Sequence, residues 1–93
     1  MVLSQFGYYV YVLRSQELEK LYVGYTKNLN NRLIEHKQKK TRTTAKANDW
    51  KLIYYEVCIN QQDAINREKQ FKTGFGRAYL KRRLENYLNN MTG

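Results

Sequence analysis

One carboxylate falls where a helical pattern predicts an apolar side chain. In residues 60–73, Ala64, Ile65 and Phe71 recur with helical spacing, and Glu68 lies on the same stripe. Burial of an unpaired carboxylate is unfavourable, so Glu68 must reach solvent, pair with a cationic side chain or hold a metal cation. The pattern alone leaves a structural salt bridge and a metal ligand both open.

Two tyrosines and a basic pair precede this glutamate. Tyr11 and Tyr22 lie in short aromatic and β-branched runs, where tyrosine usually serves packing. Arg32 and His36 are four residues apart, so they lie one turn apart on one side of a helix. The planar guanidinium of Arg32 suits phosphate oxygens, although a surface salt bridge with Glu35 is a simpler role. A lone histidine can relay a proton near neutral pH, or it can be incidental.

The elements that must position these residues follow the order β-β-α-β-α-α. Strands are expected at residues 8–13, 21–25 and 50–57, and helices at roughly 27–40, 60–73 and 77–90. The short connection between the first two strands predicts an antiparallel hairpin. The expected fold class is therefore α/β, of the α+β type: a small three-stranded, mostly antiparallel sheet flanked by helices, in a single domain spanning 1–93.

Local signals predict how these helices begin and end. Thr26 is expected to cap the first helix, and Asn60 with Asp63 resembles a capping pair for the second. Gly74 suits the left-handed position just after that helix. Gly24, near the end of a strand, indicates a bulge or a close approach of backbone or ligand.

The chain carries a formal net charge of +9, with 17 lysines and arginines against 8 acids. Such a field attracts polyanions, either nucleic acid or an anionic membrane surface. The basic residues form two groups that could follow a phosphate backbone or could be solvated faces. Apart from Arg32, the first group is Lys37, Lys39, Lys40, Arg42 and Lys46, and the second is Arg77, Lys81, Arg82 and Arg83.

The cysteine count and the hydropathy pattern exclude several classes of protein. The single cysteine, Cys58, cannot form an intramolecular disulfide and is expected to pack as a small hydrophobe. With one histidine beside it, the usual four-ligand zinc site is excluded. No stretch is long enough to span a membrane and no signal peptide is evident, so the chain is expected to be cytoplasmic.

The motifs Tyr9-Val10-Tyr11 and Tyr22-Val23-Gly24, followed by Arg32, His36 and Glu68, resemble those of the GIY-YIG nuclease superfamily. The resemblance covers about residues 8–88. It is closest to the small single-domain, UPF0213-like members, whose first motif reads Tyr-Val-Tyr.

This resemblance implies a catalytic role for Tyr11, Tyr22, Arg32, His36 and Glu68. The tyrosines become acid/base and positioning groups, although it does not say which one is the base. Arg32 becomes the stabiliser of charge on the phosphate, and Glu68 the holder of one Mg²⁺ or Mn²⁺ ion completed by water and substrate.

The function implied is a metal-dependent endonuclease that hydrolyses phosphodiester bonds in DNA and is guided by structure rather than sequence. RNA is left open as a substrate. A non-catalytic nucleic-acid-binding module that keeps the nuclease fold is the alternative. A protein-binding adaptor is a third interpretation. The complete set of five residues favours catalysis, because a binding module needs arginines but not Glu68.

Overall fold

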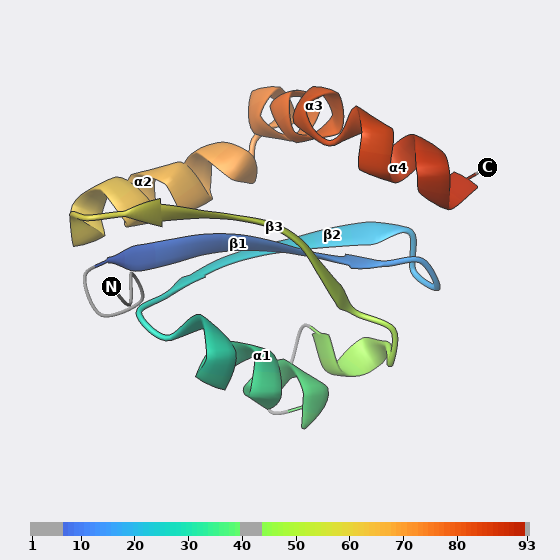
Figure 1. The fold of residues 1–93 in the computed structure, drawn as a ribbon, viewed down its shortest axis with the longest axis horizontal. Helices are drawn as coiled ribbons and strands as arrows, with labels where there is room; N and C mark the ends of the chain where they lie inside the picture. Colours follow the sequence, from blue (N-terminus) through green and yellow to red (C-terminus); the bar gives the residue numbers. More distant parts are fainter. Residues whose placement is uncertain (1–6, 40–43, 93) are drawn as a thin grey trace.

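The computed structural model describes residues 7–39 and 44–92, and it has the α+β fold predicted from the sequence. A three-stranded antiparallel sheet lies between α1 on one face and α2, α3 and α4 on the other (Figure 1). The elements are β1 Tyr8–Ser15, β2 Lys20–Thr26, α1 Leu29–Lys37, the 3-10 helix η2 Thr44–Lys46, β3 Lys51–Cys58, α2 Gln61–Phe71, α3 Gly74–Arg83 and α4 Glu85–Thr92.

Strand β1 is the centre of the sheet, in the order β2-β1-β3. Helices cover both faces of the sheet, so successive side chains of β1 are all buried, alternately on one face and on the other. Tyr9, Tyr11 and Leu13 enter the core beneath α1, while Val10 and Val12 enter the core beneath α2 and α3. Tyr11, one of the two tyrosines predicted to be catalytic, is therefore a core residue on the α1 face of the sheet.

Helix α1 begins later than predicted, and Thr26 is not its cap. Asn28 is the N-cap, and its side-chain oxygen accepts a hydrogen bond from the backbone N–H of Asn31 at 3.0 Å. The Thr26 hydroxyl instead accepts from the Asn28 N–H at 3.1 Å, which fixes the turn between β2 and α1. The helix ends at Lys37, short of the predicted residue 40.

Helix α2 begins as predicted. The side chain of Asn60 accepts hydrogen bonds from the backbone N–H groups of Gln62 at 2.8 Å and Asp63 at 3.2 Å. Its apolar stripe is buried through Ala64 and Phe71, which are both fully inaccessible. Between them, Ile65, Arg67 and Glu68 are partly buried.

An arginine–carboxylate pair fixes α2 on the sheet. Arg67 of α2 donates to both carboxylate oxygens of Glu56 on β3, each at 2.9 Å. The Tyr54 hydroxyl donates to the same carboxylate at 2.7 Å. The guanidinium carbon of Arg67 lies 4.3 Å from the ring centre of Phe71 and 5.0 Å from that of Tyr79. These contacts hold α2 in one rotation, so they also position the glutamate that it carries.

The prediction for Gly74 was wrong, because α3 begins there. Lys72 is the C-cap of α2, and none of the glycines in the described residues has a positive φ. The Thr73 hydroxyl accepts from the Gly76 N–H at 3.1 Å and donates to the Gln70 carbonyl at 2.7 Å, which joins the two helices directly. A capping threonine thus replaces the left-handed glycine.

The single helix predicted over residues 77–90 is two helices. Leu84 ends α3 with φ −110° and ψ 20°, and α4 starts at the next residue. Leu80 is fully buried and Leu84 packs against the same core, so the bend keeps the stripe on the twisted sheet. Neither proline nor glycine stands at this bend to signal it.

Cys58 packs against the core, as the sequence predicted. The Cys58 thiol is partly buried against the core of the α2 face, and that burial raises its pKa, as expected for a packing residue. Among the described residues, no helix has both the length and the hydropathy to cross a membrane.

Gly76→Ala is expected to destabilise the protein by about 1–3 kcal/mol, measured by chemical unfolding. A Cβ at Gly76 would lie only 2.6 Å from the Cα of Phe71 and closer still to the Gln70 carbonyl, so the helices would have to separate. Gly74→Ala is the matched control, because nothing lies within 4 Å of its Cβ position. Equal stability of the two variants would contradict this packing.

Candidate active site

Tyr11 lies at the centre of the sheet, opposite Gly24 on β2, and only 1% of it is exposed. Its hydroxyl lies over the Gly24 backbone, where a Cβ would come within 2.6 Å of the oxygen. The sequence predicted a bulge or a close approach of backbone or ligand at Gly24, whereas the group that approaches it is the Tyr11 side chain. Any larger residue at position 24 would displace that hydroxyl.

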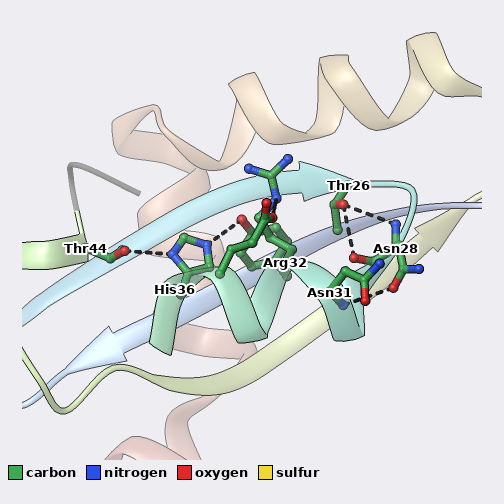
Figure 2. A network of polar contacts seen from close by, with 8 residues as sticks. Thr26, Asn28, Asn31, Arg32, His36 and Thr44 are labelled. Carbon is green, nitrogen blue, oxygen red and sulfur yellow. Dashed lines mark hydrogen bonds and ion pairs between the residues drawn. The ribbon is translucent and has the colours of Figure 1, made fainter. Parts of the chain in front are cut away.

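A buried chain of hydrogen bonds starts from this hydroxyl. The Tyr11 hydroxyl and His36 Nε2 are 2.9 Å apart, and His36 Nδ1 and the Thr44 hydroxyl are 2.7 Å apart. His36 is 5% exposed, and Thr44 is fully buried. Figure 2 shows the His36 imidazole with its hydrogen bond to Thr44. A neutral imidazole donates from one nitrogen and accepts at the other, so the chain can run in either direction.

Tyr22 completes an aromatic cluster around the imidazole. Its ring centre is 6.2 Å from that of Tyr11 and 5.1 Å from that of His36, and the Tyr11 and His36 ring centres are 5.7 Å apart. Trp50 adjoins the cluster at 6.4 Å from Tyr22. The structure therefore brings together three of the five predicted catalytic residues.

Burial raises the pKa of Tyr11 well above its usual range, and the neighbouring Tyr22 raises it further. The positive charge of Arg32 opposes this shift, whereas the negative charge of Glu68 adds to it. Both charged residues are thus within electrostatic reach of the phenol, although they come from opposite faces of the sheet. At neutral pH the resting form of Tyr11 is protonated.

Arg32 lies one turn before His36 on α1, with 39% of its side chain exposed. Its Nε is 3.4 Å from a carboxylate oxygen of Glu35, which makes an ion pair but not a hydrogen bond. That Nε is buried and finds no acceptor in the parts of the chain that the structure describes. Arg32 and Glu35 line an open cleft of about 710 Å³ with Lys27 and Asn31. The arginine keeps hydrogen-bonding capacity beside that cleft.

Glu68 is partly buried on α2, with 18% of its side chain exposed, so the structure places it at the border of the apolar stripe. One oxygen lies 3.5 Å from the ammonium group of Lys72, whose side chain is 53% exposed. Within residues 7–39 and 44–92, no group of three or more histidine, cysteine or acidic side chains is arranged to hold a metal. A divalent ion here would have one protein carboxylate and would need oxygens from water and substrate.

The described residues of the two predicted basic groups belong to elements on opposite faces of the sheet (Figure 1). Lys37, Lys39 and Lys46 are exposed on the side of α1, and the four residues of the second group are exposed along α3. Lys40 and Arg42 lie outside the described residues. The Arg83 guanidinium is less available for phosphates than the others, because it also interacts with Tyr54. A hydrogen bond with Tyr54 raises the pKa of Arg83. A nucleic acid would have to pass the edge of the sheet to meet both groups.

Sequence reasoning missed Thr44 and Trp50. Thr44 holds the second nitrogen of His36, and its backbone carbonyl accepts a hydrogen bond from the Trp50 indole N–H at 2.7 Å. Thr44 belongs to the run Thr-Arg-Thr-Thr, in which nothing distinguishes one hydroxyl from the next. Only the folded position of η2 selects it.

Comparison with known proteins places this arrangement in a family. Residues 7–82 match the GIY-YIG catalytic domain, so the chain belongs to the GIY-YIG family.

It is similar to proteins called UPF0213. One from Pediococcus pentosaceus is 45% identical over 67 residues, covering 71% of this chain and 70% of the relative. One from Pediococcus acidilactici is 38% identical over 91 residues, covering 94% and 86%. One from Oceanobacillus iheyensis is 35% identical over 66 residues, covering 70% and 76%. No solved structure matches.

Protonation of His36 is expected to destabilise the fold. Burial lowers its pKa from the usual 6.5, Arg32 lowers it further, and Glu35 opposes the shift. A lowered folded-state pKa contributes stability that is present above the unfolded-state pKa and is lost as the pH falls through the folded-state pKa. The melting temperature should therefore fall below about pH 6.5, before most carboxylates titrate at about pH 4.

The His36→Gln variant tests this assignment, because it retains polar groups but does not titrate. Its melting temperature should vary less than that of the wild type between about pH 6.5 and pH 5. Parallel curves for the two proteins would show that His36 is not the group responsible.

Proposed function

We propose that the protein is a divalent-metal-dependent endonuclease that hydrolyses phosphodiester bonds in DNA at structural features rather than at a fixed sequence. The observation that carries this proposal is the hydrogen bond between the buried Tyr11 hydroxyl and His36. Any buried hydroxyl needs a hydrogen-bond partner, but a histidine whose second nitrogen is held by Thr44 also offers a path for the Tyr11 proton. Membership of the GIY-YIG family supports a nuclease.

The proposed reaction begins with a water molecule that attacks phosphorus opposite the leaving oxygen. The water gives its proton to the Tyr11 oxygen as the Tyr11 proton passes to neutral His36 Nε2. Burial keeps His36 neutral at pH 7 and therefore able to accept that proton. Tyr22, packed against both rings, holds them in place. The phosphorus–oxygen bond then breaks on the far side.

Arg32 is proposed to offset negative charge that grows on the phosphate. Its buried Nε makes no hydrogen bond within the described residues, and the side chain lines the open cleft. The ion pair with Glu35 is long and half-exposed, so a phosphate oxygen can compete for the guanidinium. A guanidinium that lines an open cleft and is held only by a long ion pair is available for a contact formed in the transition state.

Glu68 fits the part of a single metal ligand. Its only ion pair among the described residues is with an exposed lysine that can swing away. A lone carboxylate suits Mg²⁺ or Mn²⁺, which keep water and take substrate oxygens as further ligands. Such an ion would stabilise negative charge on the leaving oxygen. The negative charge of Glu68 contributes, behind burial and the nearer groups, to the raised pKa of Tyr11, which is compatible with this role.

The basic surface is proposed to bind phosphates without reading bases. Lysine and arginine contacts to phosphates give affinity but little sequence preference. Because the exposed basic groups lie on both faces of the sheet, a bent or branched nucleic acid meets them better than a straight duplex. The second candidate, a binding module without catalysis, would use the same cations and leave Glu68 in its ion pair with Lys72.

Glu68→Gln is expected to abolish Mg²⁺-dependent nicking of supercoiled DNA. The amide keeps the shape of the side chain but loses the charge that attracts the ion. DNA affinity, measured in EDTA, should change little. The melting temperature should also change little, because a partly exposed ion pair contributes only about 0–1 kcal/mol.

Glu85→Gln is the matched control, because it makes the same chemical change on the exposed first turn of α4. It should nick DNA at the wild-type rate. If Glu68→Gln also nicks normally while its melting temperature falls, Glu68 is a structural residue and the metal site is wrong.

Arg32→Ala should lower the cleavage rate at saturating DNA by about 10²–10³-fold. The affinity in EDTA should fall much less, because the proposed partner charge develops only in the transition state. Arg32→Lys should recover only part of the rate, since lysine keeps the charge but loses the planar fork. Equal losses of rate and affinity would make Arg32 an ordinary phosphate anchor.

A further inference from the structure

A second hollow lies at the other end of α1, away from the cleft that Arg32 lines. It has a volume of about 700 Å³ and is formed by α1, the segment after η2, and the start of β3. Ligand pockets typically have volumes of about 300–1,000 Å³. Its walls are mainly apolar: Leu13, Leu33, Ala47, Trp50 and Leu52.

Trp50 is a fixed wall of this hollow. Its indole N–H donates to the Thr44 carbonyl at 2.7 Å, so the ring is held and only its carbon surface is left to contact a ligand. The preceding residue, Asp49, accepts hydrogen bonds from the Ser15 hydroxyl at 2.6 Å and the Glu17 N–H at 2.8 Å. Residues 49 and 50 are thus held against the end of β1 and the turn that follows it. A ligand would not lose binding energy by fixing this part of the chain.

The lining is basic as well as apolar. Lys37, Lys39 and Lys51 line the hollow together with the amide of Asn48, and its described lining includes no acidic residue. Lys39 stands just beyond the end of α1 with φ 59°, a left-handed conformation that favours glycine. A lysine held there at some conformational strain keeps a cation beside the hollow.

This hollow adjoins the proposed reaction centre. His36 lines it and is also hydrogen-bonded to the Tyr11 hydroxyl. Tyr22 contacts both His36 and Trp50 edge-on. A group bound in the hollow would therefore be separated only by His36 from the phosphate on which Tyr11 and His36 are proposed to act.

We infer that the hollow is a subsite for one unpaired nucleotide next to the cut phosphate, with its base on Trp50 and its phosphates near the three lysines. The inference rests on the proposed nuclease function. It would give a physical reason why the nuclease prefers structural features of DNA to a fixed sequence. Bases in a duplex are stacked on one another, so only an unpaired or extruded base offers a face to a side chain. Aromatic and cationic side chains together are how proteins hold single strands.

Trp50 is the only tryptophan of the chain, so its fluorescence reports on this subsite directly. In EDTA, where no cleavage interferes, a short oligothymidylate should quench that fluorescence as it binds. An abasic oligonucleotide of equal length, with phosphates but no bases, should bind without quenching. A blunt duplex should also bind without quenching.

Variants separate the base contact from the charge. Trp50→Leu should weaken oligothymidylate binding by about 5- to 150-fold, and Trp50→Phe by much less, although both lose the same indole N–H. Neither should weaken duplex binding to the same extent. Lys39→Gly suits its left-handed backbone, so the fold should persist while the salt slope for the single strand falls by roughly 0.7. Lys69→Ala, an exposed lysine of α2, is the charge-matched control.

The outcomes distinguish this subsite from the nuclease itself. DNA cleavage without quenching, or equal quenching by base-containing and abasic strands, would overturn the subsite and leave the nuclease intact. Quenching by oligothymidylate with no cleavage of any DNA would support the subsite and remove catalysis. Absence of all nucleic-acid binding would overturn both.

Discussion

The hydrogen bond between Tyr11 and His36 is the contact on which the rest of the site depends. It joins the central strand to α1 through two side chains that are almost fully buried. Gly24 must lack a side chain because the Tyr11 hydroxyl lies over it. Thr44 must stand on the far side of His36 to satisfy the second nitrogen. A buried polar chain of this kind is stable only when every member has its partner, so these elements are constrained together.

The proposed catalytic residues come from both faces of the sheet. The α1 face supplies the aromatic cluster and Arg32, whereas α2 on the other face supplies Glu68. Both charges nevertheless act on the pKa of Tyr11, which lies on the central strand β1. The Arg67–Glu56 pair holds α2 against β3, and in the proposed mechanism it would thereby orient Glu68.

The sequence predicted the features that depend on local pattern. The strands, the stripe through Ala64 and Phe71, and the Asn60 cap follow from periodicity and capping chemistry alone. It failed where neighbouring residues compete for one role, as Thr26 and Asn28 do at the start of α1.

The remaining misses are decided by contacts between separate elements, even where these are close in the sequence. His36 of α1 selects Thr44 of η2, and α3 crosses α2 at Gly76 too closely for a Cβ. The bend at Leu84 keeps a helix stripe on a curved sheet, which no residue nearby encodes.

The most direct test of the account is the rate at which Tyr11→Phe nicks supercoiled and branched DNA with Mg²⁺, compared with the wild type and with EDTA controls. The change removes one oxygen and leaves the ring packed in the core. The account predicts that the wild type cuts only with metal. It predicts that the variant is less stable by about 1–3 kcal/mol, because His36 loses a partner, but remains folded, binds DNA, and cuts at least about 10²-fold more slowly. A Tyr11→Phe protein that cuts at the wild-type rate would contradict it.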